Sequence, residues 1–382
     1  MHICHIVFRF DIGGLENGIV NILNHLPEVG YRHSILCLSG YNPEFFARIR
    51  AGGVAIHTLN KRPGKDIGYL KRLYGLLRAL RPDIVHTRNL NTLECQAVAW
   101  LAGVPVRIHG EHGWDSGDAR TRRKPALIRK VFSPLISRYV ALSAETEGYL
   151  STRVGISPRR IERICNGVDI DRFRPGRPLA AASPTEATLV IGSIGRLAEV
   201  KNHQLLIRAF ARLLERAGSR SERLHLVIVG DGPCRERLVT LVRSLDIEDR
   251  VSLPGASDNV PEAMSGLSLY VQPSCAEGIS NTILEAMASG LAVISTDVGG
   301  ARELVRPGFN GEITGNGNVE ALVEALWRYV ENPELLRLHG CNSRLRAEQD
   351  FSLATMAERY HRLYQGRSHA SGSESHPPVA ER

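Results

Sequence analysis

The sequence lacks long apolar runs and a leader-like start. No window of its 382 residues approaches the roughly 18 consecutive apolar residues that a membrane-spanning helix needs. The start, Met-His-Ile-Cys-His-Ile-Val-Phe, has no basic segment ahead of a long apolar one, so we expect a first strand there and no signal peptide. These absences favour a cytoplasmic protein that has at most peripheral contact with the inner face of the plasma membrane.

The cysteines form no recognisable pairing motif. They are scattered, odd in number and never in C-x-x-C spacing, at positions 4, 37, 95, 165, 234, 275 and 341. This distribution fits reduced thiols, and it argues against both a disulfide framework and a zinc site. The hydrophobic content of 43% and the charged content of 23% are typical of a soluble globular enzyme.

Acidic residues are scarce in the first part of the chain. Residues 1–170 hold 24 Lys and Arg against 14 Asp and Glu, whereas residues 171–382 hold 24 against 26. The imbalance predicts an acidic partner for the first part, such as an anionic lipid headgroup or a lipid pyrophosphate. The densest basic cluster comprises Arg120, Arg122, Arg123, Lys124, Arg129 and Lys130.

Apolar residues are interleaved with this basic cluster. They are Leu127, Ile128, Val131 and Phe132. The pattern predicts a basic amphipathic helix that lies on an anionic membrane surface, with an ordinary solvated helix face as the alternative. Because the cluster has little aromatic interleaving and no recognition motif, we expect no nucleic-acid partner.

Strand-like apolar runs alternate with helical segments along most of the chain. Strands are expected at 3–8, 34–38, 84–86 and 104–108, and again at 188–194, 224–229, 251–253, 267–272 and 291–296. Helices are expected at 18–26, 68–80 and 92–102 in the first half. Alternation of this kind predicts an α/β fold in which an open parallel sheet with helices on both faces is made twice.

The composition shifts near residues 170–187, which are rich in Pro, Ala, Arg and Gly and have the character of a linker. We therefore expect one domain over 1–170 and a second over 171–350. A helix at about 351–364 follows, and the Ser-, His-, Gly- and Pro-rich residues 366–382 are predicted to be disordered. Ligands in such sheets bind beyond the carboxyl ends of the strands, so two facing sheets predict a site in the cleft between the domains.

The segment 274–300 carries most of the functional information. Glu277 and Glu285 stand eight residues apart around a glycine turn and a helix start, where Ser280 and Asn281 are suitable N-cap residues. A helix N-terminus presents unpaired N–H groups and suits a phosphate. Carboxylates beside that anion must accept hydrogen bonds from neutral hydroxyls, and a nucleotide sugar offers these on its ribose and hexose. The segment therefore predicts an anion site with two hydroxyl acceptors.

Two further glycine-containing turns follow predicted strands. Gly195 and Arg196 precede Lys201 at a helix start, and a planar guanidinium with an ammonium five residues away suits a pyrophosphate. Gly13 and Gly14 follow the first strand, where glycine permits close approach to a ligand or serves turn geometry alone. Neither this turn nor the one at 229–233 completes the dinucleotide pattern G-x-G-x-x-G.

Two patterns resemble metal-binding motifs, and we expect neither to bind a metal ion. His109 and His112 have H-x-x-H spacing, but zinc hydrolases need H-E-x-x-H on a helix, and the glycines at 110 and 113 disfavour a helix. His112 is instead a candidate for positioning or polarising a sugar. Asp169 and Asp171 match D-x-D, but they fall at the domain break and are interpreted as turn residues.

Taken together, these residues resemble the retaining glycosyltransferases of family 4, which have the GT-B fold of two facing Rossmann-like domains. The resemblance covers nearly the whole chain. The E-x7-E pattern of the family matches Glu277 and Glu285, and its G-R-L…K-N pattern matches Gly195, Arg196, Leu197, Lys201 and Asn202. Its N-G-V-D hinge matches residues 166–169, its N-terminal glycine pair matches Gly13 and Gly14, and its cleft histidine matches His112. Residues 110–114 are also similar to sugar transferases linked to bacterial exopolysaccharide and exosortase loci.

The resemblance implies a role for each matched residue. Arg196 and Lys201 would neutralise the diphosphate of the donor, and backbone N–H groups near Asn281 and Thr282 would bind a phosphate. Glu285 would hold the ribose hydroxyls and Glu277 the donor hexose. His112 and the loop at 13–14 would complete the site from the facing domain.

The sequence therefore predicts a metal-independent retaining transferase, with no cofactor beyond its co-substrate. It would move a hexose from a nucleoside diphosphate sugar to a lipid-linked or polysaccharide acceptor. A nucleotide-sugar 2-epimerase and a non-catalytic nucleotide-sugar-binding protein are the alternatives.

Overall fold

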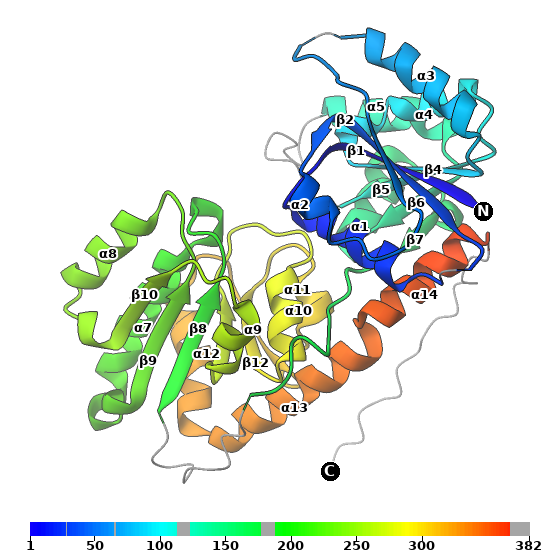
Figure 1. The fold of residues 1–382 in the computed structure, drawn as a ribbon. Helices are drawn as coiled ribbons and strands as arrows, with labels where there is room; N and C mark the ends of the chain where they lie inside the picture. Colours follow the sequence, from blue (N-terminus) through cyan, green and yellow to red (C-terminus); the bar gives the residue numbers. More distant parts are fainter. Residues whose placement is uncertain (28, 65, 113–122, 177–187, 367–382) are drawn as a thin grey trace.

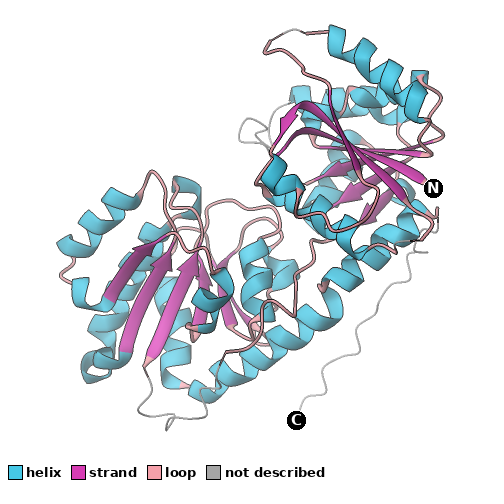
Figure 2. Ribbon diagram, in the orientation of Figure 1, coloured by secondary structure: helices cyan, strands magenta, loops and turns pink. Residues whose placement is uncertain are grey.

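Two parallel β-sheets, each with helices on both faces, make up the chain (Figures 1 and 2). The structure, a computed structural model, describes residues 1–27, 29–64, 66–112, 123–176 and 188–366. Residues 177–187 of the linker predicted at 170–187 lie outside these residues, as do Arg120 and Arg122 of the basic cluster, Gly113, and residues 367–382 of the predicted tail. The predicted α/β class with two Rossmann-like sheets is confirmed.

The first sheet has seven parallel strands in the order β3-β2-β1-β4-β5-β6-β7. Its strands are β1 (His2–Phe10), β2 (Arg32–Tyr41), β3 (Ala55–Thr58), β4 (Ile84–Arg88), β5 (Val106–Glu111), β6 (Arg138–Ala141) and β7 (Ile161–Arg163). The helices among them are α1 (Gly14–His25), α2 (Pro43–Phe46), α3 (Gly68–Leu80), α4 (Cys95–Leu101), α5 (Arg123–Phe132) and α6 (Ala144–Gly148). Apolar side chains that alternate along the strands face helices on both sides, as expected for a buried parallel sheet.

The second sheet has six parallel strands in the order β10-β9-β8-β11-β12-β13. Its strands are β8 (Leu189–Ile194), β9 (Leu224–Val229), β10 (Val251–Gly255), β11 (Leu269–Gln272), β12 (Ala292–Thr296) and β13 (Gly311–Thr314). Its helices are α7 (His203–Ala217), α8 (Arg235–Ser244), α9 (Val260–Ser265), α10 (Asn281–Ala288), α11 (Ala301–Leu304), α12 (Val319–Glu331) and α13 (Pro333–Asp350).

The last helix, α14 (Leu353–Tyr364), returns to the first domain and lies beside α1 (Figure 1). Tyr360 and Met356 pack in one buried cluster with strand residues of the first sheet, including Ile3 and Ile84. A β-bridge pairs Val168 with Ser352, where α13 gives way to α14. The chain thus crosses between the domains twice at adjacent points, and α14 fixes one crossing by apolar burial.

The predicted strands all exist, and four strands were missed. β3, β6, β7 and β13 are three or four residues long, and β7 and β13 carry charged residues within them. The predicted helix at 92–102 begins only at Cys95, after a 3₁₀ turn at Leu90–Thr92. Strands of three or four residues are too short to show a clear alternation of apolar and polar residues, so their sequences carry a weak periodic signal.

Candidate functional site

The loops that carry the predicted site residues lie where the strand order of each sheet reverses. β1 pairs with both β2 and β4, and β8 pairs with both β9 and β11. Gly13 and Gly14 follow β1, Gly195 follows β8, and Glu277 follows β11. In open parallel sheets a crevice forms at such switch points, outside the carboxyl ends of the strands.

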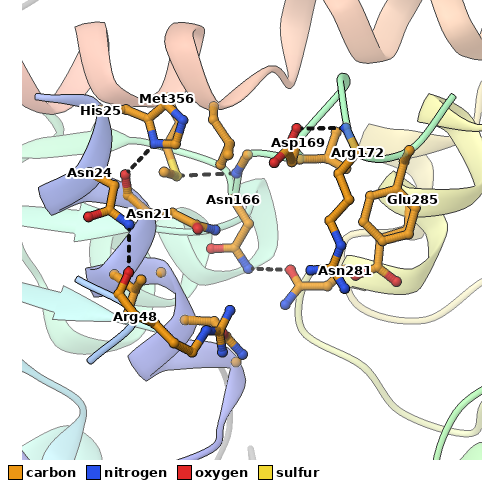
Figure 3. Close-up of a pocket in the computed structure, with 18 of the residues that line it drawn as sticks. Asn21, Asn24, His25, Arg48, Asn166, Asp169, Arg172, Asn281, Glu285 and Met356 are labelled. Carbon is orange, nitrogen blue, oxygen red and sulfur yellow. Dashed lines mark hydrogen bonds between the residues drawn. The ribbon is translucent and has the colours of Figure 1, made fainter. Parts of the chain in front are cut away.

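A cavity of about 480 Å³ lies between the two domains (Figure 3). It is lined by α1, by the segment 166–173 and by α10 and α14. The Asn166 side-chain amide donates a hydrogen bond to Oδ1 of Asn281 at 2.8 Å. Gly14 faces the same side chain, since a Cβ on Gly14 would lie 3.6 Å from Asn281 Nδ2. Asn281 therefore joins the start of α10 to Asn166 in the segment that links the domains, and lies near Gly14 of α1.

Glu277 is held by three donors on a single oxygen. Its Oε1 accepts hydrogen bonds from Lys201 Nζ at 2.6 Å, Ser274 Oγ at 2.7 Å and Gln272 Nε2 at 2.9 Å. Among the described residues, the second oxygen, Oε2, accepts no hydrogen bond. The arrangement fixes the carboxylate and leaves one oxygen for a hydroxyl donor.

Gln272 connects this carboxylate to the start of α10. Its Oε1 accepts hydrogen bonds from Thr282 Oγ1 at 3.1 Å and from the buried Tyr270 hydroxyl at 2.6 Å. Ser280 is the N-cap of α10, and its Oγ accepts the Ile283 N–H at 3.3 Å. Gln272 and Ser274 are not among the predicted site residues; the position of Gln272, a polar residue that ends the apolar strand β11, is the sequence signal for the first of them.

Arg196 is exposed at the end of β8. Its guanidinium has no hydrogen-bond or ion-pair partner within the described part of the chain. The turn before it is packed against the turn after β9, because a Cβ on Gly230 would lie 1.9 Å from the Gly195 carbonyl oxygen. The turn at 229–233 thus supports the Gly195 loop.

Glu285 lines the interdomain cavity one turn into α10. Burial raises the pKa of this carboxyl to about 7, and the nearby Arg172 opposes that rise. No direct contact joins Glu285 to Glu277 in the described residues. The structure therefore places the two predicted acids on either side of the start of α10, Glu277 in the loop before it and Glu285 within its first turns.

His112 lies on the rim of the first domain, directly after β5. Its backbone N–H donates to Oδ1 of Asn89 at 2.8 Å. Burial and the positive charge of Arg88 lower the pKa of its imidazole to about 3, so the ring is neutral at physiological pH. No hydrogen bond among the described residues joins His112 to the second domain.

The side chain of the neighbouring His109 contacts a carboxylate within the first domain. Its Nε2 lies 3.2 Å from Glu111 Oε1, and Arg129 binds both oxygens of the same carboxylate at 2.6 and 3.0 Å. Burial alone would raise the pKa of Glu111, but hydrogen bonds from His109 and Arg129 outweigh it and lower the pKa to about 2. In the described ranges no group of three or more His, Cys, Asp or Glu residues could hold a metal ion.

Asp169 has the turn role expected of it. Its Oδ1 accepts the backbone N–H groups of Asp171 at 3.0 Å and Arg172 at 2.9 Å. Both bonds lie within the segment that links the domains. The carboxylate thus stabilises the crossing point through an Asx turn.

Two protein families have models that match this chain. "Glycosyltransferase Family 4" matches residues 12–172, and "Glycosyl transferases group 1" matches residues 181–346. The first match begins after β1 and covers the other six strands of the first sheet, with the Gly13–Gly14 loop and His112. The second covers the six-stranded sheet with Arg196, Lys201 and both acids.

Similar proteins extend over almost the full length. The chain is 28% identical over 377 residues to the Escherichia coli UDP-Gal:alpha-D-GlcNAc-diphosphoundecaprenol alpha-1,3-galactosyltransferase, covering 95% of this chain and 96% of the relative. It is 28% identical over 321 residues to a GDP-mannose-dependent alpha-mannosyltransferase of Mycolicibacterium smegmatis, covering 78% and 80%.

Solved structures share the fold at lower identity. The Anabaena protein HepE in complex with UDP superposes with a TM-score of 0.79 at 20% identity, covering 96% of this chain and 100% of that one. The lipopolysaccharide outer core galactosyltransferase WaaB superposes with a TM-score of 0.75, also at 20% identity, over 96% and 100% of the two chains.

Proposed function

The chain belongs to the family 4 glycosyltransferases of the GT-B fold, and we propose that it transfers a hexose from a nucleoside diphosphate sugar with retention of configuration. The proposed acceptor is a lipid-linked or polysaccharide glycan, in exopolysaccharide or cell-surface glycan biosynthesis. The diphosphoundecaprenol acceptor named for the Escherichia coli relative supports the acceptor class. The UDP bound to the Anabaena neighbour supports the donor class.

The observation that carries the proposal is the polar network from Lys201 through Glu277 and Gln272 to Thr282. It ties an ammonium, an acid and the N-terminus of α10 together at one sheet edge. Arg196, exposed on the same edge, adds a second cation. An anion and a polyhydroxylated ring side by side form the ligand that suits this set, and a nucleoside diphosphate sugar combines the two.

The network also suggests how the site would lower the energy barrier of the reaction. Negative charge builds on the departing diphosphate as the glycosidic bond breaks. Arg196, Lys201 and the N–H groups at the start of α10 would stabilise that charge, which is the kind of fixed electrostatic help that lowers barriers most. In this proposal the side-chain cations take the place of a metal ion, and Glu277 orients the donor hexose through its second oxygen.

The direct test measures consumption of several nucleotide sugars, with UDP- and GDP-linked hexoses first. Lys201→Ala and Arg196→Ala should each lower turnover about 10²–10³-fold, the usual cost of losing one such donor. Lys71→Ala, which removes an exposed lysine from α3, is the matched control and should retain full activity. Wild-type rates in both site variants would refute the diphosphate assignment.

We further propose that the first domain binds an anionic membrane surface through α5. Lys124, Leu127, Ile128 and Val131 share one helical face, and the three apolar residues are 61%, 42% and 65% exposed. Arg129 points the opposite way and is bound by Glu111, which fixes the helix with its apolar face outward. A lipid surface suits such a face, because it takes up apolar side chains beside lysines.

Within the described ranges, the structure contains no candidate membrane-spanning helix. Sedimentation with vesicles that contain anionic lipid tests the membrane proposal. Leu127→Ser together with Val131→Ser should lower the bound fraction, whereas Lys71→Gln on α3 should leave it unchanged. Equal bound fractions of the wild type, the double variant and Lys71→Gln would refute the membrane proposal.

A further inference from the structure

The imidazole of His112 lies over a glycine that leaves room for it. Gly110 is the second-last residue of β5. A Cβ added to Gly110 would lie 2.6 Å from His112 Nε2 and 3.0 Å from its Cδ2. Carbon and nitrogen atoms do not pack that closely, so a methyl group there would displace the ring.

A second imidazole, that of His86, also lies close to this position and is held in place by its own contacts. The Cβ would also lie 3.2 Å from Nε2 of His86. His86 is fully buried, and its Nδ1 lies 3.0 Å from the Tyr364 hydroxyl and 3.5 Å from the Arg88 guanidinium. Because His86 is fixed and His112 is partly exposed, the ring that moves is the one on the site rim.

Asn89 holds the same stretch from the neighbouring strand end. Its backbone N–H donates to the Gly110 carbonyl at 2.8 Å, and its side-chain Oδ1 accepts the His112 N–H at 2.8 Å. Its own backbone has a positive φ of 59°, which is uncommon for a residue other than glycine. The two bonds fix the chain on either side of Glu111 and so set where His112 begins.

We propose that Gly110 and Asn89 are positioning residues, which set the place of the His112 imidazole on the rim of the first domain. The inference rests on the proposed transferase function, in which His112 meets the donor sugar. The unpartnered His112 Nε2 supports it, because this buried nitrogen is held by packing and not by a hydrogen bond within the described chain. The low pKa of His112 agrees with a ring that acts in its neutral form.

The test is Gly110→Ala, with Gly40→Ala as its matched control. Gly40 lies near the end of β2 in the same sheet, and among the described residues a Cβ there would meet only Arg9 Nη1, at an ordinary 3.9 Å. Displacement of a catalytic group by about 1 Å can lower turnover about 10²-fold. We expect that loss in kcat for Gly110→Ala, with little change in donor KM. Gly40→Ala should match the wild type.

A double-mutant comparison separates positioning from general damage. If Gly110 acts only through His112, Gly110→Ala should lower the rate of the wild type and leave the rate of His112→Ala unchanged. Asn89→Gly, which keeps the positive φ and removes the Oδ1 acceptor, should behave in the same way. Additive losses in the double variants would overturn the inference.

Carbon-13 spectra of labelled histidine rings give a readout that needs no turnover. The His112 resonance, assigned by its loss in His112→Ala, should shift in Gly110→Ala and stay in place in Gly40→Ala. An unshifted resonance would overturn the inference whatever the activity. Absence of donor consumption by the wild type would refute the proposed function instead, so the two failures are distinguishable.

Discussion

The carboxyl group of Glu285 should titrate near neutral pH, because burial raises its pKa to about 7 from an ordinary value of 4.5. A folded state that binds the proton more tightly than the unfolded chain is favoured at low pH. This contribution to stability is fully present below about pH 4.5 and is lost as pH rises through about 7. We expect Glu285→Gln to raise the unfolding midpoint at pH 8 more than at pH 5. Equal effects at both values, measured by thermal denaturation, would contradict the assignment.

The charged residues of the site could be predicted from the sequence, and their neighbours could not. Glu277, Glu285 and Lys201 stand beside glycine turns and helix starts, where local chemistry gives them a meaning. Ser274 contacts Glu277 only because the loop after β11 folds back on itself. The ion pair between Lys201 and Glu277 joins residues 76 apart in the chain, and no local pattern predicts it.

At the scale of elements, the N-cap of α10 serves both stability and phosphate binding. Ser280→Ala removes the acceptor of the Ile283 N–H and should lower the free energy of unfolding by about 0.5–2 kcal/mol. Ser143→Ala, the N-cap of α6 in the first domain, is the matched control, because its Oγ accepts the Thr146 N–H in the same way. Both should cost similar stability by chemical denaturation, and only Ser280→Ala should weaken UDP binding by calorimetry. Equal UDP affinity in the two variants would argue against a phosphate at α10.

The loop that carries Glu277 depends on a glycine on a neighbouring segment. Gly299 has a φ of +55°, and a Cβ there would lie 2.1 Å from the Glu277 carbonyl oxygen. Gly308 has a φ of +74°, and apart from its chain neighbours no atom of the described residues lies within 4 Å of a Cβ placed there. Gly308→Ala therefore measures the cost of the positive φ without a steric clash. Gly308→Ala should cost about 1–2 kcal/mol, and Gly299→Ala should cost about 1–3 kcal/mol more. Chemical denaturation measures the loss in the free energy of unfolding for both variants. Equal losses would show that the loop that carries Glu277 shifts to accept the methyl group at no cost in stability.

Some helices and strands could be predicted from the sequence with their observed bounds, and others could not. The predicted strand at 224–229 has the bounds of β9, and the predicted helix at 68–80 has those of α3, because each carries a sustained apolar pattern. β7 and β13 are short and polar, and their pairing with a neighbouring strand defines them. Sheet edges are stabilised by tertiary pairing, which local propensity does not report.

At the scale of the whole molecule, α14 holds the first domain in place. Tyr360 is 2% exposed and packs in the cluster that contains Ile3, Ile22 and Ile84. Tyr360→Ala should lower the free energy of unfolding by about 3–5 kcal/mol, the range for truncation of a large buried aromatic residue. Urea denaturation followed by circular dichroism measures the change. A loss below about 1 kcal/mol would show that the helix is loosely docked.

The most direct test of the central claim is proton NMR of the first sugar product formed from a nucleoside diphosphate hexose. We expect the donor to be consumed and the product to have the same anomeric configuration as the donor. Lys201→Ala should lower the product signal about 10²–10³-fold, and Lys71→Ala should leave it unchanged. An inverted product, or a donor that binds and stays intact, would contradict the account.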